Sequence, residues 1–149
     1  MATVFSKIIA GQIPGRFVWA DDLCVVFATI APITDGHMLV VPREEVDQFT
    51  DASDELLAHL IAVAKKVGQA QRAVWDAPRA AVLVAGFEVP HLHIHVLPAW
   101  DEAALRFDNA RHDVPAEELD AAAEKVRAAL RDAGHGANVP ASLTSPALG

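Results

Sequence analysis

The spacing of apolar residues along the first third of the chain predicts a short helix followed by three strands. Apolar residues recur at helical spacing over 4–10, with Thr3 available as the N-cap and Gly11 positioned to end the helix. Strand-like apolar runs, separated by turn-forming residues, follow at 16–20, 24–30 and 37–41. We therefore expect an antiparallel meander after the helix.

A long amphipathic helix is predicted next. Apolar residues lie at helical spacing over 53–75, and either Asp51 or Ser53 can cap its first turn. Pro78 ends this pattern, and two further strand-like runs follow at 81–85 and 91–97. The sheet is thus expected to have five strands.

The last third of the chain combines a loop, a helix and a tail. Residues 99–114 are mixed in character and predict a loop, after which Pro115, at an N1 position, opens a helix that Gly134 ends. Residues 135–149 contain no Asp, Glu, Lys or Arg, so we expect a tail that is loosely ordered or docked by a few apolar contacts. No linker divides the chain, and we expect a single domain over 1–134 followed by this tail.

Composition narrows the class of protein. The chain has 149 residues, 52% of them hydrophobic, which suffices for one core. Its formal net charge of -8 excludes the broad cationic surface that binds a nucleic acid polymer, so an anionic ligand must be held locally. The N-terminal residues lack the features of a secretory signal, and no apolar run is long enough to span a bilayer. We expect a cytoplasmic protein without membrane contact.

The candidate chemistry lies in three alternating histidines, His91, His93 and His95. Side chains alternate faces along a strand, so these imidazoles are expected on one face and the intervening apolar residues in the core. Neighbouring histidines then lie roughly 6.6 Å apart at Cα, and the outer two roughly 13 Å apart. Three such imidazoles cannot all reach one zinc ion at about 2.0 to 2.1 Å unless the strand bends. The only cysteine, Cys24, lies in an apolar run and is expected to be a buried thiol.

A phosphoryl group suits this row better than a metal ion does. It presents several acceptor oxygens, so the histidines can serve as nucleophile, donor to the phosphoryl oxygens and aid to the leaving group. Neutral imidazole is nucleophilic near pH 7, and the central His93 has a helper on either side. The alternative, a polar and solvated strand surface, is disfavoured because the three histidines alternate strictly with apolar residues.

The segment His91-Leu92-His93-Ile94-His95-Val96-Leu97 resembles the signature of the histidine triad (HIT) superfamily: His, apolar, His, apolar, His and two apolar residues. Residues 5–14, 21–22 and 37–42 also resemble the family's opening segment, the residues before its second strand and its central strand. The likeness is strongest over 4–100. It implies an α+β fold with a five-stranded antiparallel sheet, usually paired across a dimer interface, so a homodimer is expected.

The resemblance also implies a reaction and a set of site residues. The family attacks the α-phosphorus of a nucleotide, which points to a purine nucleotide, nucleoside phosphoramidate or dinucleoside polyphosphate as substrate, with no cofactor and no metal. His93 would form a covalent nucleotidyl-histidine intermediate, His95 would contact the phosphoryl oxygens, and His91 and His37 would complete the cluster. The residues that would line the base pocket are Val4, Phe5, Ile8, Phe27 and Ile30.

The sequence departs from the family pattern near the histidines. Thr29 stands where the family commonly has an Asp that binds the ribose, and Gly86, Phe87 and Glu88 stand where many members have Gly-Gln-Ser/Thr. We count these four among the nucleotide-binding positions, although Phe87 cannot donate a hydrogen bond and Glu88 repels a phosphate. A His expected after the central strand is Glu45, and the Cys-x-x-Cys pair that some members use for zinc is absent.

Two functions remain open after these departures. The first is an enzyme that hydrolyses or transfers a nucleoside monophosphoryl group. The second is a nucleotide-binding module of the same fold with weak or no turnover, which the missing donors favour. A metalloenzyme that uses two of the alternating histidines is disfavoured by their spacing.

Overall fold

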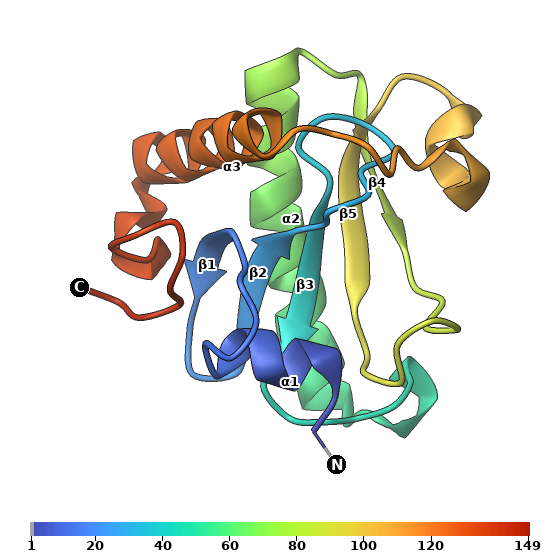
Figure 1. Cartoon of the computed structure of the whole chain (residues 1–149), viewed down its shortest axis with the longest axis vertical. Helices are drawn as coiled ribbons and strands as arrows, with labels where there is room; N and C mark the ends of the chain where they lie inside the picture. The colour runs from blue at the N-terminus through green and yellow to red at the C-terminus, as the bar shows by residue number, and fades with distance from the viewer. Residues whose placement is uncertain (1) are drawn as a thin grey trace.

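Five strands form one antiparallel sheet in the computed structural model, which describes residues 2–149 (Figure 1). Numbered in chain order, they are β1 (Phe17–Ala20), β2 (Cys24–Ala28), β3 (Met38–Pro42), β4 (Arg79–Leu83) and β5 (Ile94–Ala99). The order across the sheet is β1-β2-β3-β5-β4, so the first three strands form the predicted meander and β5 lies between β3 and β4. The predicted fold class and the predicted five strands are confirmed.

Both faces of the sheet are covered, which explains why its central strands are apolar throughout. In β2, Cys24 and Val26 belong to one core, whereas Val25 and Phe27 belong to a second core on the opposite face. Strand β3 alternates between the two cores in the same way. Because side chains alternate across a strand, a strand buried on both faces reads as a continuous apolar run.

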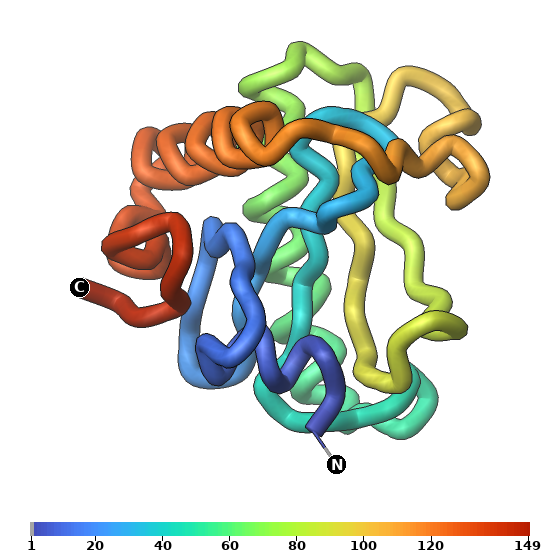
Figure 2. Tube along the Cα trace, in the orientation of Figure 1, coloured from blue at the N-terminus to red at the C-terminus, as the bar shows by residue number. Residues whose placement is uncertain are grey.

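Three α-helices cover the sheet: α1 (Val4–Ile9), α2 (Asp54–Trp75) and α3 (Ala116–Leu130). The predicted caps of the first two are present, because the side chains of Thr3 and Ser53 accept hydrogen bonds from the first turn of α1 and α2. Helix α2 packs on the face that carries the first core, and α1 contributes Phe5 to the second core. Figures 1 and 2 show α1 in front of the sheet and α2 behind it.

Short turns complete the chain. Four are 3-10 turns and one is a π turn that continues α3; they span Phe49–Asp51, Glu102–Leu105, Phe107–Asn109, Gly136–Asn138 and, for the π turn, Arg131–His135. The predicted loop over 99–114 therefore contains two turns, which lie near β4 and β5, and the chain then crosses to α3 (Figure 1).

The strand that was expected over 91–97 begins at Ile94, so the prediction that all three histidines stand on a strand is wrong for His91 and His93. The pairing of β3 with β5 ends at Val40 and Ile94, and loop contacts hold the chain before that point. The alternation nevertheless continues through this segment, because Leu92, Ile94 and Val96 all lie in the first core. The histidines therefore share the opposite face, which is the face that α1 covers.

The tail after Gly134 is held more firmly than its composition predicts. The buried guanidinium of Arg127, on α3, donates to the carbonyls of Pro140 and Ser142 at 2.8 and 3.3 Å. The N–H of Phe17 donates to the Leu143 carbonyl at 2.7 Å, so the tail pairs with the outer edge of β1. These bonds depend on tertiary placement of one arginine, which the absence of charge in the tail itself does not reveal.

A close approach between the loop before β3 and the end of α2 fixes the position of His37. Gly36 has a φ of 81°, and a Cβ at that position would overlap the Trp75 ring. The buried Gln71 amide donates to the carbonyls of Gly36 and Val96, each at 2.8 Å, and so ties this loop to β5. His37 follows directly and is thereby held beside β5.

No helix among residues 2–149 combines the length and the apolar character that crossing a membrane requires.

Candidate active site

Residues 91–93 lie just before the ladder of the sheet and are held by other hydrogen bonds, whereas His95 lies within β5. The N–H of Leu92 donates to the Val46 carbonyl at 2.7 Å, and the N–H of His91 donates to the Val89 carbonyl at 2.8 Å. The His91 ring is fully buried, with Nε2 2.8 Å from the Pro42 carbonyl oxygen. Because strand pairing begins only at Ile94, these contacts set the position of the residues before it.

Hydrogen-bond partners assign the protons of His91 and His93. A carbonyl oxygen only accepts, so neutral His91 carries its proton on Nε2, which faces Pro42, and its Nδ1 accepts from the Thr3 hydroxyl at 2.6 Å. His93 Nδ1 lies 2.7 Å from the His91 carbonyl and must likewise donate. In neutral His93 the Nε2 lone pair is therefore unprotonated.

The same reasoning assigns His37 and His95. The N–H of Ile33 donates to His37 Nδ1 at 3.1 Å, so the proton of His37 lies on Nε2. That nitrogen is 2.9 Å from His95 Nδ1, which therefore accepts. Neutral His95 carries its proton on Nε2, and the rings of His93 and His95 lie edge to face with centroids 4.9 Å apart. An unprotonated nitrogen on His93 thus stands beside an imidazole that can donate.

Burial keeps His37, His93 and His95 neutral at pH 7. Desolvation, together with the neighbouring His95, lowers the pKa of His37 from 6.5 to about 3. Desolvation and the neighbouring His93 lower the pKa of His95 to about 4. Desolvation also lowers the pKa of His93, against the hydrogen bond to the His91 carbonyl, which raises it. His93 is therefore neutral at pH 7, which is the form in which an imidazole is nucleophilic.

Of the five residues that would line the base pocket, three form an apolar wall beside His93: Phe5, Ile8 and Phe27. The Phe5 ring lies edge to face with His93 at 4.9 Å between centroids and with Phe27 at 5.5 Å. Ile8 packs against the same core. Val4 and Ile30 are exposed, with Ile30 exposing 74% of its surface, and neither belongs to this core.

The four positions that depart from the family pattern have different surroundings. Thr29 Oγ1 accepts a hydrogen bond from the Ala31 N–H at 3.2 Å. Gly86, Phe87 and Glu88 lie in the loop between β4 and β5, where Phe87 exposes 98% of its surface and packs against nothing. The Glu88 carboxylate is near enough to His93 to raise that histidine's pKa, although burial outweighs this effect. Glu88 therefore places a negative charge within electrostatic range of His93.

Two residues that sequence reasoning missed contact the histidines. Phe107, in a turn after β5, packs edge to face on His95 at 4.9 Å between centroids. No periodicity marks residues 99–114, so the sequence holds no signal for this contact. Thr3 was identified as a helix cap, whereas its second bond, to His91, depends on how α1 docks.

A separate group of potential metal ligands, Asp21, Cys24 and His59, has donor atoms that all lie within 4.8 Å of one another. These groups already bond to each other: Asp21 Oδ2 lies 2.7 Å from His59 Nε2 and accepts from Trp19 Nε1–H at 2.8 Å and from the Cys24 thiol at 3.6 Å. Burial alone would raise the pKa of Asp21, but hydrogen bonds from Trp19 and from the β1–β2 turn lower it to about 2. Burial raises the pKa of the Cys24 thiol. The side chains of Asp21, Cys24 and His59 therefore bond to one another, which accounts for their close approach without a metal ion.

Comparison with known proteins identifies the family. The model of the HIT domain matches residues 10–102. An uncharacterized HIT-like protein of Synechococcus elongatus is 37% identical over 101 residues, which cover 64% of this chain and 88% of that protein.

Solved structures agree with this match. A zinc-bound histidine triad family protein from Mycobacterium smegmatis has a TM-score of 0.78 and 27% identity, covering 91% of this chain and 98% of that one. A HIT family hydrolase from Legionella pneumophila has a TM-score of 0.56 and 29% identity, covering 64% and 91%. Since the family model spans more than half of the chain and includes all three alternating histidines, the protein belongs to the HIT domain family.

Proposed function

We propose that the chain hydrolyses or transfers a nucleoside monophosphoryl group and that His93 is its nucleophile. The observation that carries this proposal is the 2.7 Å hydrogen bond from His93 Nδ1 to the His91 carbonyl. It keeps the proton on Nδ1 and leaves the Nε2 lone pair available, beside the donor His95. The hydrolase name of the Legionella relative supports a hydrolytic outcome.

In the proposed reaction, His93 Nε2 forms a bond to the α-phosphorus of a nucleoside phosphoramidate or dinucleoside polyphosphate. The bond from phosphorus to the leaving nitrogen or oxygen breaks, and a leaving amine takes up a proton from solvent. His95 donates a hydrogen bond to a phosphoryl oxygen, where negative charge develops. Water then bonds to the phosphorus and loses a proton, the N–P bond breaks, and neutral His93 returns with release of a nucleoside monophosphate.

The apolar wall of Phe5, Ile8 and Phe27 is the proposed site for the purine base. Aromatic and aliphatic side chains bind such a base by burial and edge contacts, without reading its hydrogen-bonding groups. The wall adjoins His93 through Phe5, so a nucleotide whose base lies there brings its phosphate to the histidines.

The second candidate is a nucleotide-binding module with weak or no turnover. It is favoured by the loop over 84–90, in which Phe87 faces solvent and Glu88 carries a negative charge near His93. Both functions predict nucleotide binding, and only the first predicts a covalent intermediate.

The test is a panel of purine nucleoside phosphoramidates and dinucleoside polyphosphates, with acid quench and mass analysis of the intact protein and its peptides. Wild type is expected to release nucleoside monophosphate and to carry a nucleotidyl group on His93. His93→Asn should abolish both and still bind nucleoside monophosphate, whereas His112→Asn, at an exposed histidine, should behave as wild type. Absence of release by wild type from every substrate would overturn the enzymatic proposal and leave the binding module.

We also propose a homodimer that pairs along β4. The outer edge of β1 is occupied by the tail, through the bond from Phe17 N–H to the Leu143 carbonyl, whereas no strand pairs with the outer edge of β4 among residues 2–149. An unpaired edge invites a further strand. Val82 and Val84, at this edge, expose 46% and 41% of their surfaces.

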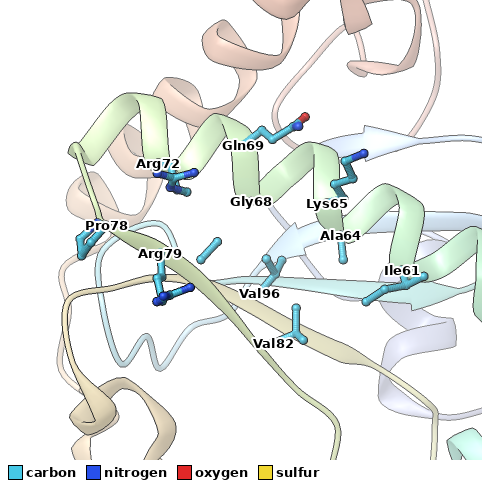
Figure 3. Close-up of a pocket in the computed structure, with 11 residues that line it drawn as sticks. Ile61, Ala64, Lys65, Gly68, Gln69, Arg72, Pro78, Arg79, Val82 and Val96 are labelled. Carbon is cyan, nitrogen blue, oxygen red and sulfur yellow. The ribbon is translucent and has the colours of Figure 1, made fainter.

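A groove of about 320 Å³ between α2 and β4 also favours this part of the molecule as the dimer interface. Figure 3 shows Ile61 and Val82 toward one end of it and Arg72 and Arg79 at the other, near Pro78. A second copy that continues the sheet would cover the apolar part. Wild type should therefore have the mass of a dimer by light scattering, and Val82→Lys should give monomers. Leu23→Lys, at an equally exposed apolar residue remote from β4, should stay dimeric; a monomeric wild type would contradict the proposal.

A further inference from the structure

One hydroxyl joins the first helix to the histidine segment. Thr3 Oγ1 accepts a hydrogen bond from the Ser6 N–H at 3.0 Å, which caps α1, and lies 2.6 Å from His91 Nδ1. In a neutral imidazole only one nitrogen carries a proton, so with Nε2 donating to Pro42 the Thr3 hydroxyl donates its own proton to Nδ1. A single side chain thus accepts from the helix and donates to the buried imidazole.

The Thr3 backbone is held as well. Its N–H donates to Glu45 Oε1 at 2.8 Å, and Glu45 lies just after β3, whose last residue is Pro42. The hydrogen bonds of the Ser6 side chain and the Thr3 N–H lower the pKa of Glu45, which is therefore charged at neutral pH. Residues 3, 45 and 91 come from three separate segments and meet at this point.

The position of His93 depends on His91 more than on the sheet. His93 precedes β5, and the Nδ1–H of its ring donates to the His91 carbonyl. The peptide that carries this carbonyl is held through the Leu92 N–H, which donates to the Val46 carbonyl at 2.7 Å, and through the His91 ring, which is clamped between Thr3 on one nitrogen and Pro42 on the other. Release of one nitrogen frees the ring to turn and removes one of the contacts that hold residue 91, so its carbonyl is less firmly placed.

Helix α1 also depends on the Thr3 side chain for its position. It has six residues, too few for a stable helix in isolation, so its place is set by its cap and by packing. Its Phe5 touches both His91 and His93, with ring centroids 5.8 and 4.9 Å apart. Movement of α1 would remove a wall from His93 and from the proposed base site together.

We propose that Thr3 is a positioning residue, which holds the His91 ring through its donated hydrogen bond and, together with the bond from Leu92 to Val46, supports the carbonyl that orients His93. The consequence for catalysis rests on the proposed role of His93 as nucleophile. The consequence for the His91 ring does not, and it can be measured in the absence of substrate.

The test compares Thr3→Val, Thr3→Ser and Thr3→Asp in protein labelled with ¹⁵N at histidine. Wild type should show His91 with an unprotonated Nδ1 that accepts a hydrogen bond. In Thr3→Val the Nδ1 signal should move downfield, since the lone pair loses its donor, whereas Thr3→Ser should restore the wild-type signal. Thr3→Asp keeps a carboxylate that can cap α1 but has no proton to donate, so its His91 should gain a proton on Nδ1.

Turnover provides the second readout. Thr3→Val and Thr3→Asp should lower kcat by about 10-fold to 100-fold, because small misplacement of a nucleophile is costly, and Thr3→Ser should recover it. Ser53→Ala removes an equivalent cap from α2 and should leave kcat unchanged.

The outcomes separate the two proposals. If the His91 signal is the same in wild type and Thr3→Val, the positioning role of Thr3 is wrong whatever the activity. If the signal moves and kcat stays at the wild-type value, the carbonyl is not controlled by Thr3, and the inference also fails. If wild type turns over no substrate, the proposed function fails, while the His91 signals still decide whether Thr3 holds the ring.

Discussion

His37 Nε2 lies 2.9 Å from His95 Nδ1, and this contact determines which nitrogen of His95 can serve a ligand. His37 cannot reverse its tautomer without losing the hydrogen bond that its Nδ1 accepts from the Ile33 N–H. The proton of His95 is consequently directed to Nε2. The hydrogen bonds from Ile33 to His37 and from His37 to His95 therefore leave the Nε2–H of His95 as the donor at the proposed site of phosphoryl binding.

Replacement of His37 should impair catalysis while His93 remains intact. His37→Phe fills a similar volume but offers no donor to His95 Nδ1, so the His95 ring loses its orientation. We expect kcat/KM to fall by about 10-fold to 100-fold with a smaller change in nucleotide binding, in a steady-state assay. His112→Phe, at an exposed position, is the control. Wild-type kcat/KM in His37→Phe would contradict the assigned role.

The acid limb of the pH–rate profile should lie below the ordinary titration of histidine. Protonation of Nε2 removes the nucleophilic lone pair of His93, and desolvation lowers the pKa of this residue from 6.5. The acidic midpoint of the kcat/KM profile of wild type should therefore lie below about 6.5. A midpoint at or above 6.5 would show that His93 is not desolvated in the free enzyme.

Stability should fall in acid for a related reason. The pKa values of His37 and His95 are lowered to about 3 and about 4, whereas the unfolded chain titrates near 6.5. Between these values the unfolded state binds more protons, so the stabilisation that is complete above pH 6.5 is lost progressively as pH falls toward 3. Denaturant unfolding at pH 7, 5.5 and 4.5 should show this decrease, and His37→Phe should have a shallower dependence than wild type.

Much of this arrangement is local in the sequence, and that part was predictable. The alternation over 91–97 indicated which side chains face the core. Thr3 and Ser53 are residue types that cap helices, and they indicated where α1 and α2 begin. The family resemblance supplied the role of His37, since no local pattern relates it to residue 95.

The parts that sequence reasoning missed depend on tertiary contact. The strand starts at Ile94 because β3 ends its pairing there, which no property of residues 91–97 encodes. Phe107 reaches His95 from a segment without periodicity, and Thr3 reaches His91 across 88 positions of sequence. The family resemblance assigned Ile30 to the base pocket, and its exposure of 74% depends on the turn that follows β2.

Neutralising Glu88 should improve activity toward an anionic substrate. Its carboxylate lies near His93 and repels the phosphate that must approach there. Glu88→Gln should raise kcat/KM by about fivefold at low ionic strength, and the gain should shrink as salt screens the charge. Glu117→Gln, which removes the same charge at the start of α3, should have little effect. A fall in kcat/KM for Glu88→Gln would instead indicate that the carboxylate assists the reaction.

Two glycines with the same positive φ offer a test of the packing that holds His37. Gly11 and Gly36 both have a φ of 81°, but a Cβ on Gly11 meets nothing within 4 Å, whereas on Gly36 it would overlap the Trp75 ring. Gly11→Ala should lower the free energy of unfolding by about 1 to 2 kcal/mol, the cost of a left-handed backbone for alanine.

Gly36→Ala should cost about 1 to 3 kcal/mol more than Gly11→Ala, because a packed core resists an added methyl group. It should also reduce turnover, since His37 follows Gly36 directly and the carbonyl of Gly36 receives the Gln71 amide. Urea unfolding measures the first effect, and kcat/KM at a temperature where both variants are folded measures the second. Equal destabilisation by the two substitutions would mean that the loop yields to the methyl group, and unchanged turnover would mean that His37 keeps its place when it does.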